Sequence, residues 1–143
     1  AADARHRAVE AALDLAAEKR LHELLVEAAS AGLLRSAHDC AEGGAAIALA
    51  ECAIRSGLGV VAELAELGGR PELALFSESA SRAIASCAPD DAEALLALAR
   101  AHAVPVARIG RVGGDRIRIA PGVDVSLAEA HDVWSRTLPE ALG

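Results

Sequence analysis

The sequence predicts an α/β (α+β) fold: one layered domain in which a mixed β-sheet packs against α-helices. Residues 14–32 carry apolar side chains at the spacing of an amphipathic helix. Residues 36–55 have the pattern of a strand, a glycine turn and a helix. Residues 116–119 alternate Arg-Ile-Arg-Ile, which is the period of a strand with one buried face.

The length and composition favour a single domain with its own core. The chain has 143 residues, a formal net charge of −7 and 53% apolar residues, and alanine makes up about a quarter of it. We assign residues 14–143 to this domain and residues 1–13 to a connector or an N-terminal helical extension. Because the sequence has no initiator Met, we expect it to be a fragment of a longer chain.

The composition also excludes several classes of protein. The apolar fraction is too high for a disordered chain, and no uncharged stretch reaches the roughly 18 residues that cross a bilayer. The charge is acidic, Lys19 is the only lysine, and one Phe and one Trp offer little surface for base stacking. We therefore expect neither a nucleic-acid partner nor a membrane partner.

The cysteines indicate a reducing compartment. Cys40, Cys52 and Cys87 lack CxxC spacing, are odd in number and follow no signal peptide, so we predict reduced thiols in a cytoplasmic protein. The histidines outside residues 36–44, His22 among them, show no ligand spacing either. We predict no metal site, and a structural role for His22.

The first half of the chain holds the clearest helix signals. In the helix at 14–32, Asp14 is a suitable N-cap and Gly32 a suitable stop. Its inward face consists of Ala17, Leu21, Leu24, Leu25 and Ala28. A strand at 36–40 and a helix at 45–55 flank the glycine turn.

The middle of the chain predicts two strands and a helix. Strand candidates at 58–64 and 83–87 are separated by a Gly- and Pro-containing loop at 68–71. Pro89 and two following aspartates predict the start of a helix that runs to about His102.

The C-terminal part predicts a hairpin and a last helix. Residues 106–112 and 116–120 are expected to pair across a Gly-Gly-Asp turn. Ser126 and Glu129 have capping-box spacing at the start of the last helix, which we expect to end at Pro139. Its inward residues are predicted to be Leu127, Ala130 and Trp134.

Two segments carry candidate binding residues. In the first, the turn Glu42-Gly43-Gly44 precedes a helix, where free backbone amides and the helix dipole suit a phosphate. His38 and Asp39, on the preceding strand, are secondary candidates; they point to opposite faces, which argues against a catalytic dyad. A tight turn with no ligand explains the same glycines.

The second segment is the polar loop at 77–82. Its hydroxyls and Arg82 suit a phosphate, and Glu78 suits an amine, a hydroxyl or a metal-bound water. Ser79 is a candidate with Arg82, and Ser81 is a secondary one. The alternative is a loop whose serines bind their own backbone.

A basic strip on the predicted hairpin is a third feature. In an acidic chain it suits a neighbouring domain or an anionic ligand, although a solvated sheet face is the simpler interpretation. The strip consists of Arg108, Arg111, Arg116 and Arg118.

Four segments together carry a family resemblance. They are Ser-Ala-His-Asp-Cys-Ala-Glu-Gly-Gly at 36–44, Ala-Leu-Ala-Glu at 48–51, Leu-Phe-Ser-Glu-Ser-Ala-Ser-Arg at 75–82 and Ile-Gly-Arg-Val-Gly-Gly at 109–114, followed by Trp134 and Leu138. Across nearly the whole chain from Asp14, this pattern resembles the C-terminal domain of phosphoribosylformylglycinamidine synthase, the synthetase subunit of the purine pathway. The superfamily includes aminoimidazole ribonucleotide synthetase and selenophosphate synthetase.

The resemblance implies ATP-dependent amidation of formylglycinamide ribonucleotide, with Mg²⁺ bridging the nucleotide and ammonia delivered by a glutaminase partner subunit. It also implies that the catalytic residues and the ATP and Mg²⁺ ligands lie on N-terminal domains of the same subunit. We expect no catalytic residue and no tightly bound cofactor in this fragment, and no activity from it alone.

The resemblance further implies that this is the second of two copies of the unit. In the first copy a Glu-Ser-Gln stretch contacts substrate, and the matching residues here are Glu78, Ser79 and Ala80, so the third position departs from the pattern. Two alternatives remain: a domain of another ATP-dependent synthetase of the superfamily, and a non-catalytic module that buttresses the active half.

Overall fold

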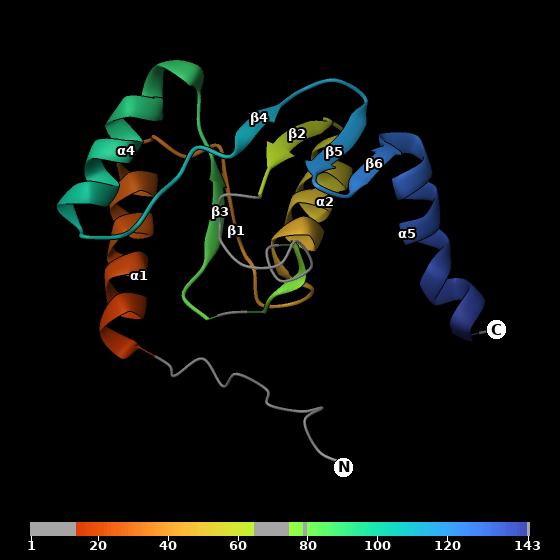
Figure 1. The fold of residues 1–143 in the computed structure, drawn as a ribbon, viewed down its shortest axis with the longest axis horizontal. Coiled ribbons are helices and arrows are strands. Elements are labelled where there is room, and N and C mark those ends of the chain that lie inside the picture. The colour runs from red at the N-terminus through yellow and green to blue at the C-terminus, as the bar shows by residue number, and fades with distance from the viewer. Residues whose placement is uncertain (1–13, 65–74, 79, 143) are drawn as a thin grey trace, which may run out of the picture.

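The computed structural model describes residues 14–64, 75–78 and 80–142, and its elements lie in three groups (Figure 1). The connector predicted at 1–13, the loop at 68–71 and the candidate Ser79 lie outside the described residues. The first group is α1 (Leu15–Ser30) beside α4 (Ala92–Ala101). The second is an antiparallel pair, β1 (Ser36–Asp39) with β3 (Ala83–Ser86). The third is a four-stranded sheet with α2 (Gly44–Ser56) and α5 (Leu127–Leu142).

The four-stranded sheet has the order β4-β2-β5-β6. Its strands are β4 (Gly110–Val112), β2 (Val60–Glu63), β5 (Arg116–Ala120) and β6 (Val123–Ser126). β2 runs antiparallel to β4 and parallel to β5, so this sheet is mixed. The predicted α/β (α+β) class, a mixed sheet packed against helices, is confirmed.

The predicted hairpin of 106–112 with 116–120 is wrong, because β2 lies between the two strands. Gly59, just before β2, explains the insertion: its amide donates to Gly114 O and its carbonyl accepts from Gly113 N, both at 2.8 Å. A Cβ on Gly59 would lie 2.4 Å from Arg116 O, so only glycine fits inside the loop. Alternation identifies a strand but not its neighbour.

The sheet's hairpin is instead β5–β6, and the sequence analysis missed β6. The tight connection at 120–122 is closed by a hydrogen bond from Gly122 N to Ile119 O, at 3.0 Å. β6 has the same alternation as β5, with Val123 and Val125 half-buried and Asp124 exposed. β6 has only four residues and is followed directly by a helix. Its alternation is therefore too short to be recognised in the sequence as a strand.

The core lies between α2 and the inner face of the sheet. Ile117 and Ile119 are 0% and 1% exposed, which confirms the predicted alternation. The core side chains of α2 are mostly alanines, so the helix backbone lies close to the sheet. The α2 core residues are Ala45, Ala46, Ala48, Leu49 and Ala53, and they pack with Val60, Ala62, Cys40, Leu64 and Leu75.

The N-terminal helix follows its sequence signals. Asp14 Oδ1 accepts hydrogen bonds from Ala16 N and Ala17 N, both at 3.0 Å, so the predicted N-cap is confirmed. The helix ends just before Gly32, whose φ of +72° suits glycine. His102, the C-cap of α4, lies 2.7 Å from Glu27 Oε2 and joins the two helices. A short 3₁₀ turn at Pro89–Asp91 precedes α4, as predicted for this start.

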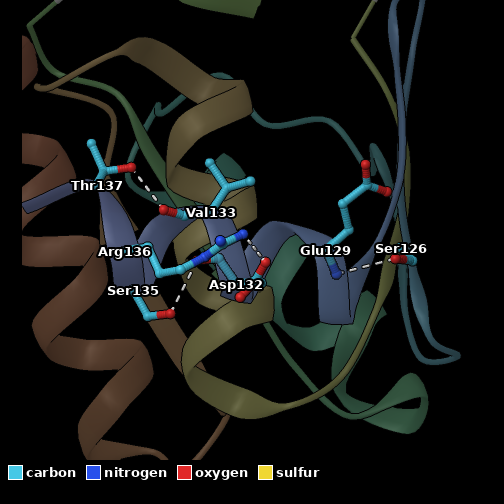
Figure 2. A network of polar contacts seen from close by, with 7 residues as sticks. All are labelled: Ser126, Glu129, Asp132, Val133, Ser135, Arg136 and Thr137. Atoms are coloured by element: carbon cyan, nitrogen blue, oxygen red, sulfur yellow. Dashed lines mark hydrogen bonds and ion pairs between the residues drawn. The ribbon is translucent and has the colours of Figure 1, made fainter. Parts of the chain in front are cut away.

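The last helix starts as predicted but differs at its other end. Glu129 N donates to Ser126 Oγ at 3.1 Å (Figure 2). Leu127 and Ala130 pack against the core, whereas Trp134, predicted to point inward, is 51% exposed. Figure 1 shows the reason: by its second half α5 has left the edge of the sheet. The helix also continues past Pro139 to Leu142, since a proline in the last turn removes only one backbone donor.

Polar side chains of α5 bond to their own helix. Thr137 Oγ1 donates to Val133 O at 2.7 Å, Ser135 Oγ donates to Asp132 O at 3.1 Å, and Arg136 pairs with Asp132 (Figure 2). Of these contacts, the Arg136–Asp132 pair has the i, i+4 spacing that stabilises a helix. Within the described part of the chain, no helix combines the length and the apolar character that a membrane span requires.

Candidate functional site

The two segments predicted to carry the site meet at the N-terminus of α2. Gly43 N donates a hydrogen bond to Glu78 Oε1 at 2.9 Å. Gly43 and Gly44 have φ values of +74° and +75°, the left-handed region that glycine occupies without strain. Glu78 therefore satisfies one of the free amides at the start of a helix whose cap residue, Gly43, has no side chain to do so.

A second contact fixes the same loop. A Cβ on Gly44 would lie 2.6 Å from the carbonyl carbon of Phe76 and 2.8 Å from Leu75 O. The backbone of the 75–78 loop therefore rests directly on the glycine turn, with Leu75 buried in the core. Close backbone approach explains Gly44, and the helix end is covered by an internal carboxylate. Glu42, the remaining predicted residue of the turn, is exposed.

The other predicted residues lie along an open groove of about 600 Å³ between α1 and the β1–β3 pair. His38, Asp39, Ser81 and Arg82 all line it. Ala41 lines it as well, two residues before the glycine turn, so the groove ends beside the Gly43–Glu78 contact. The structure thus brings the predicted residues to two adjoining places.

Ser81 holds an unusual conformation at the rim of the groove. Its φ of +61° is rare for a residue with a side chain, and its hydroxyl donates to Glu18 of α1. His22, one turn further along α1, lies 2.9 Å from Glu18 Oε1. Glu18 is not among the residues predicted from the sequence, and His22 was predicted to be structural; their i, i+4 spacing is the signal that links them.

His38 is engaged through both ring nitrogens. Nδ1 lies 2.6 Å from Asp39 O and 3.4 Å from Asp39 Oδ1, and Nε2 lies 3.0 Å from Glu51 Oε2 on α2. The closer partners are a backbone carbonyl oxygen and a carboxylate oxygen. The arrangement ties β1 to α2. Glu51 is a second residue that the sequence analysis did not select.

Arg82 places a guanidinium at the groove. Among the described residues, no carboxylate lies within ion-pair distance of its guanidinium. Arg82 partly offsets the effect of burial on Cys40, whose thiol pKa is raised chiefly by desolvation. A guanidinium at a groove is suited to a phosphate or carboxylate group.

The described residues of the groove do not form a metal site. Across residues 14–64, 75–78 and 80–142, no three His, Cys, Asp or Glu side chains converge as a ligand set. Glu18 and Glu51 are each paired with a histidine, and Glu78 accepts a backbone amide. The described residues therefore do not fit a Mg²⁺ ion, which prefers several oxygen ligands in octahedral geometry.

Comparison with known proteins shows that this chain has relatives of similar sequence. The chain is 43% identical over 132 residues to the phosphoribosylformylglycinamidine synthase subunit PurL of Thermomicrobium roseum, and 45% identical over 132 residues to that of Moorella thermoacetica. Each alignment covers 90% of this chain and 18% of the relative. The chain thus spans less than a fifth of the length of these relatives.

Solved structures agree with the sequence relatives. The structure of PurLQS from Thermotoga maritima matches with a TM-score of 0.73 and 27% identity over 80% of this chain and 21% of that one. T. maritima PurL complexed with ATP matches with a TM-score of 0.73 and 26% identity, over 87% of this chain and 23% of that one. The family model of the AIR synthase related protein, C-terminal domain, matches residues 2–120. This chain therefore belongs to the family of AIR synthase related C-terminal domains.

Proposed function

We propose that the chain is the C-terminal domain of a phosphoribosylformylglycinamidine synthase, an ATP-dependent C–N ligase that amidates formylglycinamide ribonucleotide in purine biosynthesis. The observation that carries this proposal is the similarity to PurL over nine tenths of the chain, at more than 40% identity. It includes both segments that meet at the Gly43–Glu78 contact. The matching T. maritima PurL structures include one complexed with FGAR and one complexed with ATP.

The domain forms a wall of the binding cleft and contributes no catalytic residue. Its binding residues are Glu42, Gly43, Gly44, Glu78, Ser79 and Arg82, with His38, Asp39 and Ser81 as secondary contributors. Arg82 meets an anionic group of the ligand, Ser81 is held by Glu18 at the rim of the groove, and Glu78 holds the loop against α2. Residues 14–143 act as this domain, and residues 1–13 are a connector or an N-terminal helical extension.

ATP, Mg²⁺ and the reacting atoms belong to other domains of the intact enzyme, which works in the cytoplasm with a glutaminase subunit. ATP bound there would supply the phosphoryl group that makes the amide oxygen a leaving group, so that ammonia could attack the amide carbon and displace phosphate. The absence of a fitting ligand set in the described groove supports this division. The isolated 143-residue chain is accordingly inactive.

A non-catalytic buttress is the second candidate function, and the Glu78 contact favours it. A carboxylate already covers the amide end of α2, so the place where a phosphate would bind is taken. The family model, named for AIR synthase, also leaves room for another ATP-dependent synthetase of the superfamily.

Substrate titrations of the full-length protein separate these functions. With ammonia as nitrogen donor, Arg82→Ala should raise the KM for formylglycinamide ribonucleotide or ATP at least tenfold, because it removes the guanidinium at the groove. Arg35→Ala, at an exposed arginine that does not line the groove, is the control and should leave both KM values unchanged. If Arg82→Ala lowers only the Tm, the domain is a buttress. If the wild-type protein amidates no formylglycinamide ribonucleotide, the ligase assignment is wrong.

A further inference from the structure

The second half of α5 presents an apolar patch to solvent. Val133 and Trp134 are 57% and 51% exposed, and among the exposed large apolar residues of the described chain they are the one consecutive pair. Leu127 and Ala130 pack against the core, and Trp134 continues their stripe at the spacing i, i+3, i+7. In its second half α5 extends away from the sheet (Figure 1). The apolar stripe of α5 therefore continues beyond the core of this domain.

Polar groups beside the patch are satisfied within α5 itself. Thr137, one turn after Val133, donates its hydroxyl hydrogen bond to Val133 O at 2.7 Å. Arg136 pairs with Asp132, so these two charges offset each other (Figure 2). Burying Val133 and Trp134 therefore costs little desolvation, because the nearest hydroxyl and guanidinium keep their partners.

The charges around the patch suit a permanent contact. Glu129, one turn before Val133, is exposed in the first turn of α5, where the helix dipole favours a negative charge. His131 is exposed in the same turn, at the rim of the patch. Permanent interfaces are more apolar than transient ones and resemble a domain core cut in half, and tryptophan is a frequent anchor of interfaces. An adjacent valine and tryptophan with charge only at the rim fit that kind of interface.

The rest of the same subunit is the partner that fits a permanent contact. The alignments cover 18% of each PurL relative, so more than four fifths of each relative lies outside the matched part. The family model ends at residue 120, before α5 begins. This inference rests on the proposed function, in which the domain is a wall of a cleft and must be held against the domain that completes that cleft. We infer that Val133 and Trp134 dock α5 onto a preceding domain of the same subunit.

Hydroxyl-radical footprinting of the full-length protein tests this contact. Radicals oxidise exposed tryptophan, and mass spectrometry of the peptide that contains Trp134 gives its oxidation rate. Docking should lower that rate at least tenfold relative to the protein unfolded in urea, whereas a half-exposed Trp134 would lose only about twofold. The protection should be equal with and without the glutaminase subunit and independent of protein concentration. These two conditions exclude the glutaminase and a second copy of the chain as the occupant.

Glutamate substitutions on two sides of α5 give a second test. Trp134→Glu places a charge in the contact, so trypsin should release this domain from the full-length protein at least tenfold faster. Ala128→Glu adds the same charge at an exposed residue roughly 120° around the helix from Trp134, and it should be digested like the wild type. Trp134→Phe keeps an aromatic anchor and should also be digested at close to the wild-type rate.

Three results would overturn the docking inference. The first is a Trp134 that is oxidised in the native full-length protein at about half its rate in urea. The second is protection that appears only with the glutaminase or only at high protein concentration. The third is equal digestion of the Trp134→Glu and Ala128→Glu proteins.

The wild-type footprint decides the question if Trp134→Glu does not fold. The proposed ligase is tested separately, by amidation of formylglycinamide ribonucleotide with ammonia. Failure of the wild-type protein in that assay would refute the ligase, while the footprint of Trp134 would still report on the contact.

Discussion

The backbone amide of Gly43 donates a hydrogen bond to Oε1 of Glu78, 2.9 Å away and 35 residues later in the sequence. This contact joins the glycine turn to the polar loop. It also places a negative charge at the amide end of α2, where the helix dipole favours one. The contact is therefore both a helix cap and the link between the two halves of the candidate site.

Removing the Glu78 carboxylate should destabilise the domain. Glu78→Ala leaves the Gly43 amide without its partner and should lower the free energy of unfolding by about 1 kcal/mol, as other helix caps do. Glu78→Gln keeps an acceptor oxygen without the charge and should lose less. Urea denaturation measures both variants. Glu42→Ala, at an exposed neighbour, serves as the control, and equal losses in Glu42→Ala and Glu78→Ala would contradict the cap.

Gly44 should tolerate no side chain. Gly44→Ala combines a φ of +75° with a Cβ 2.6 Å from the Phe76 carbonyl carbon, so we expect a loss of about 2–4 kcal/mol. Gly32→Ala is the matched control: its φ is +72°, but a Cβ there meets nothing within 4 Å. It should lose roughly 1–2 kcal/mol from the backbone alone. Equal losses of unfolding free energy in the two variants would mean that the Phe76 backbone moves away from the new Cβ at no cost.

Residues on the two faces of the sheet should respond differently to truncation. Ile117→Ala removes a fully buried side chain and should lower the free energy of unfolding by about 2–5 kcal/mol. Val61→Ala, on the outer face of β2, should change it by about 0.5 kcal/mol or less, because Val61 is 48% exposed. Thermal denaturation compares the two. A large loss at Val61 would show that the outer face is packed.

Asp124 should contribute to stability above acidic pH only. The hydrogen bond from Arg116, with the charges of Arg116 and Arg118, lowers the pKa of this carboxyl in the folded state. A lowered folded pKa means that the contribution is present above the ordinary aspartate pKa and is lost as pH falls through the folded value. The Tm difference between wild type and Asp124→Asn should therefore shrink at low pH.

Asp115→Asn is the control for this pH series. Asp115 is exposed, and among the described residues its carboxylate has no arginine within ion-pair distance. Its effect on Tm should change less with pH than that of Asp124→Asn. A Tm difference for Asp124→Asn that stays constant from neutral to strongly acidic pH would contradict the assigned pair.

Cys40 should be the slowest of the three thiols to react. It is 2% exposed, and burial raises the pKa of its thiol, so little thiolate is present at neutral pH. Cys52 and Cys87 are both partly buried, but burial raises the pKa of the Cys52 thiol as well, so Cys87 should be alkylated first by iodoacetamide at pH 7.5. Mass spectrometry after timed quenching measures each site. The difference should vanish in urea, and equal rates in the folded protein would contradict the burial of Cys40.

The sequence by itself determined the local elements. Asp14 and Ser126 mark helix starts, Gly32 marks a helix end, and the Arg-Ile-Arg-Ile run marks a strand with one buried face. These features depend on backbone groups and side chains a few residues apart, so they can be recognised in short stretches of chain.

Only the tertiary structure decided which distant segments meet. β2 enters between β4 and β5 because Gly59 fits within the loop before β5, and α5 leaves the sheet before Trp134. Glu78 reaches Gly43, and Glu18 reaches Ser81, across many residues of chain. Pairings of this kind depend on the shape of the elements and the space between them. The periodicity of a short stretch of sequence carries no information about either. The predicted domain class was therefore accessible from the sequence, while the geometry of its site required the fold.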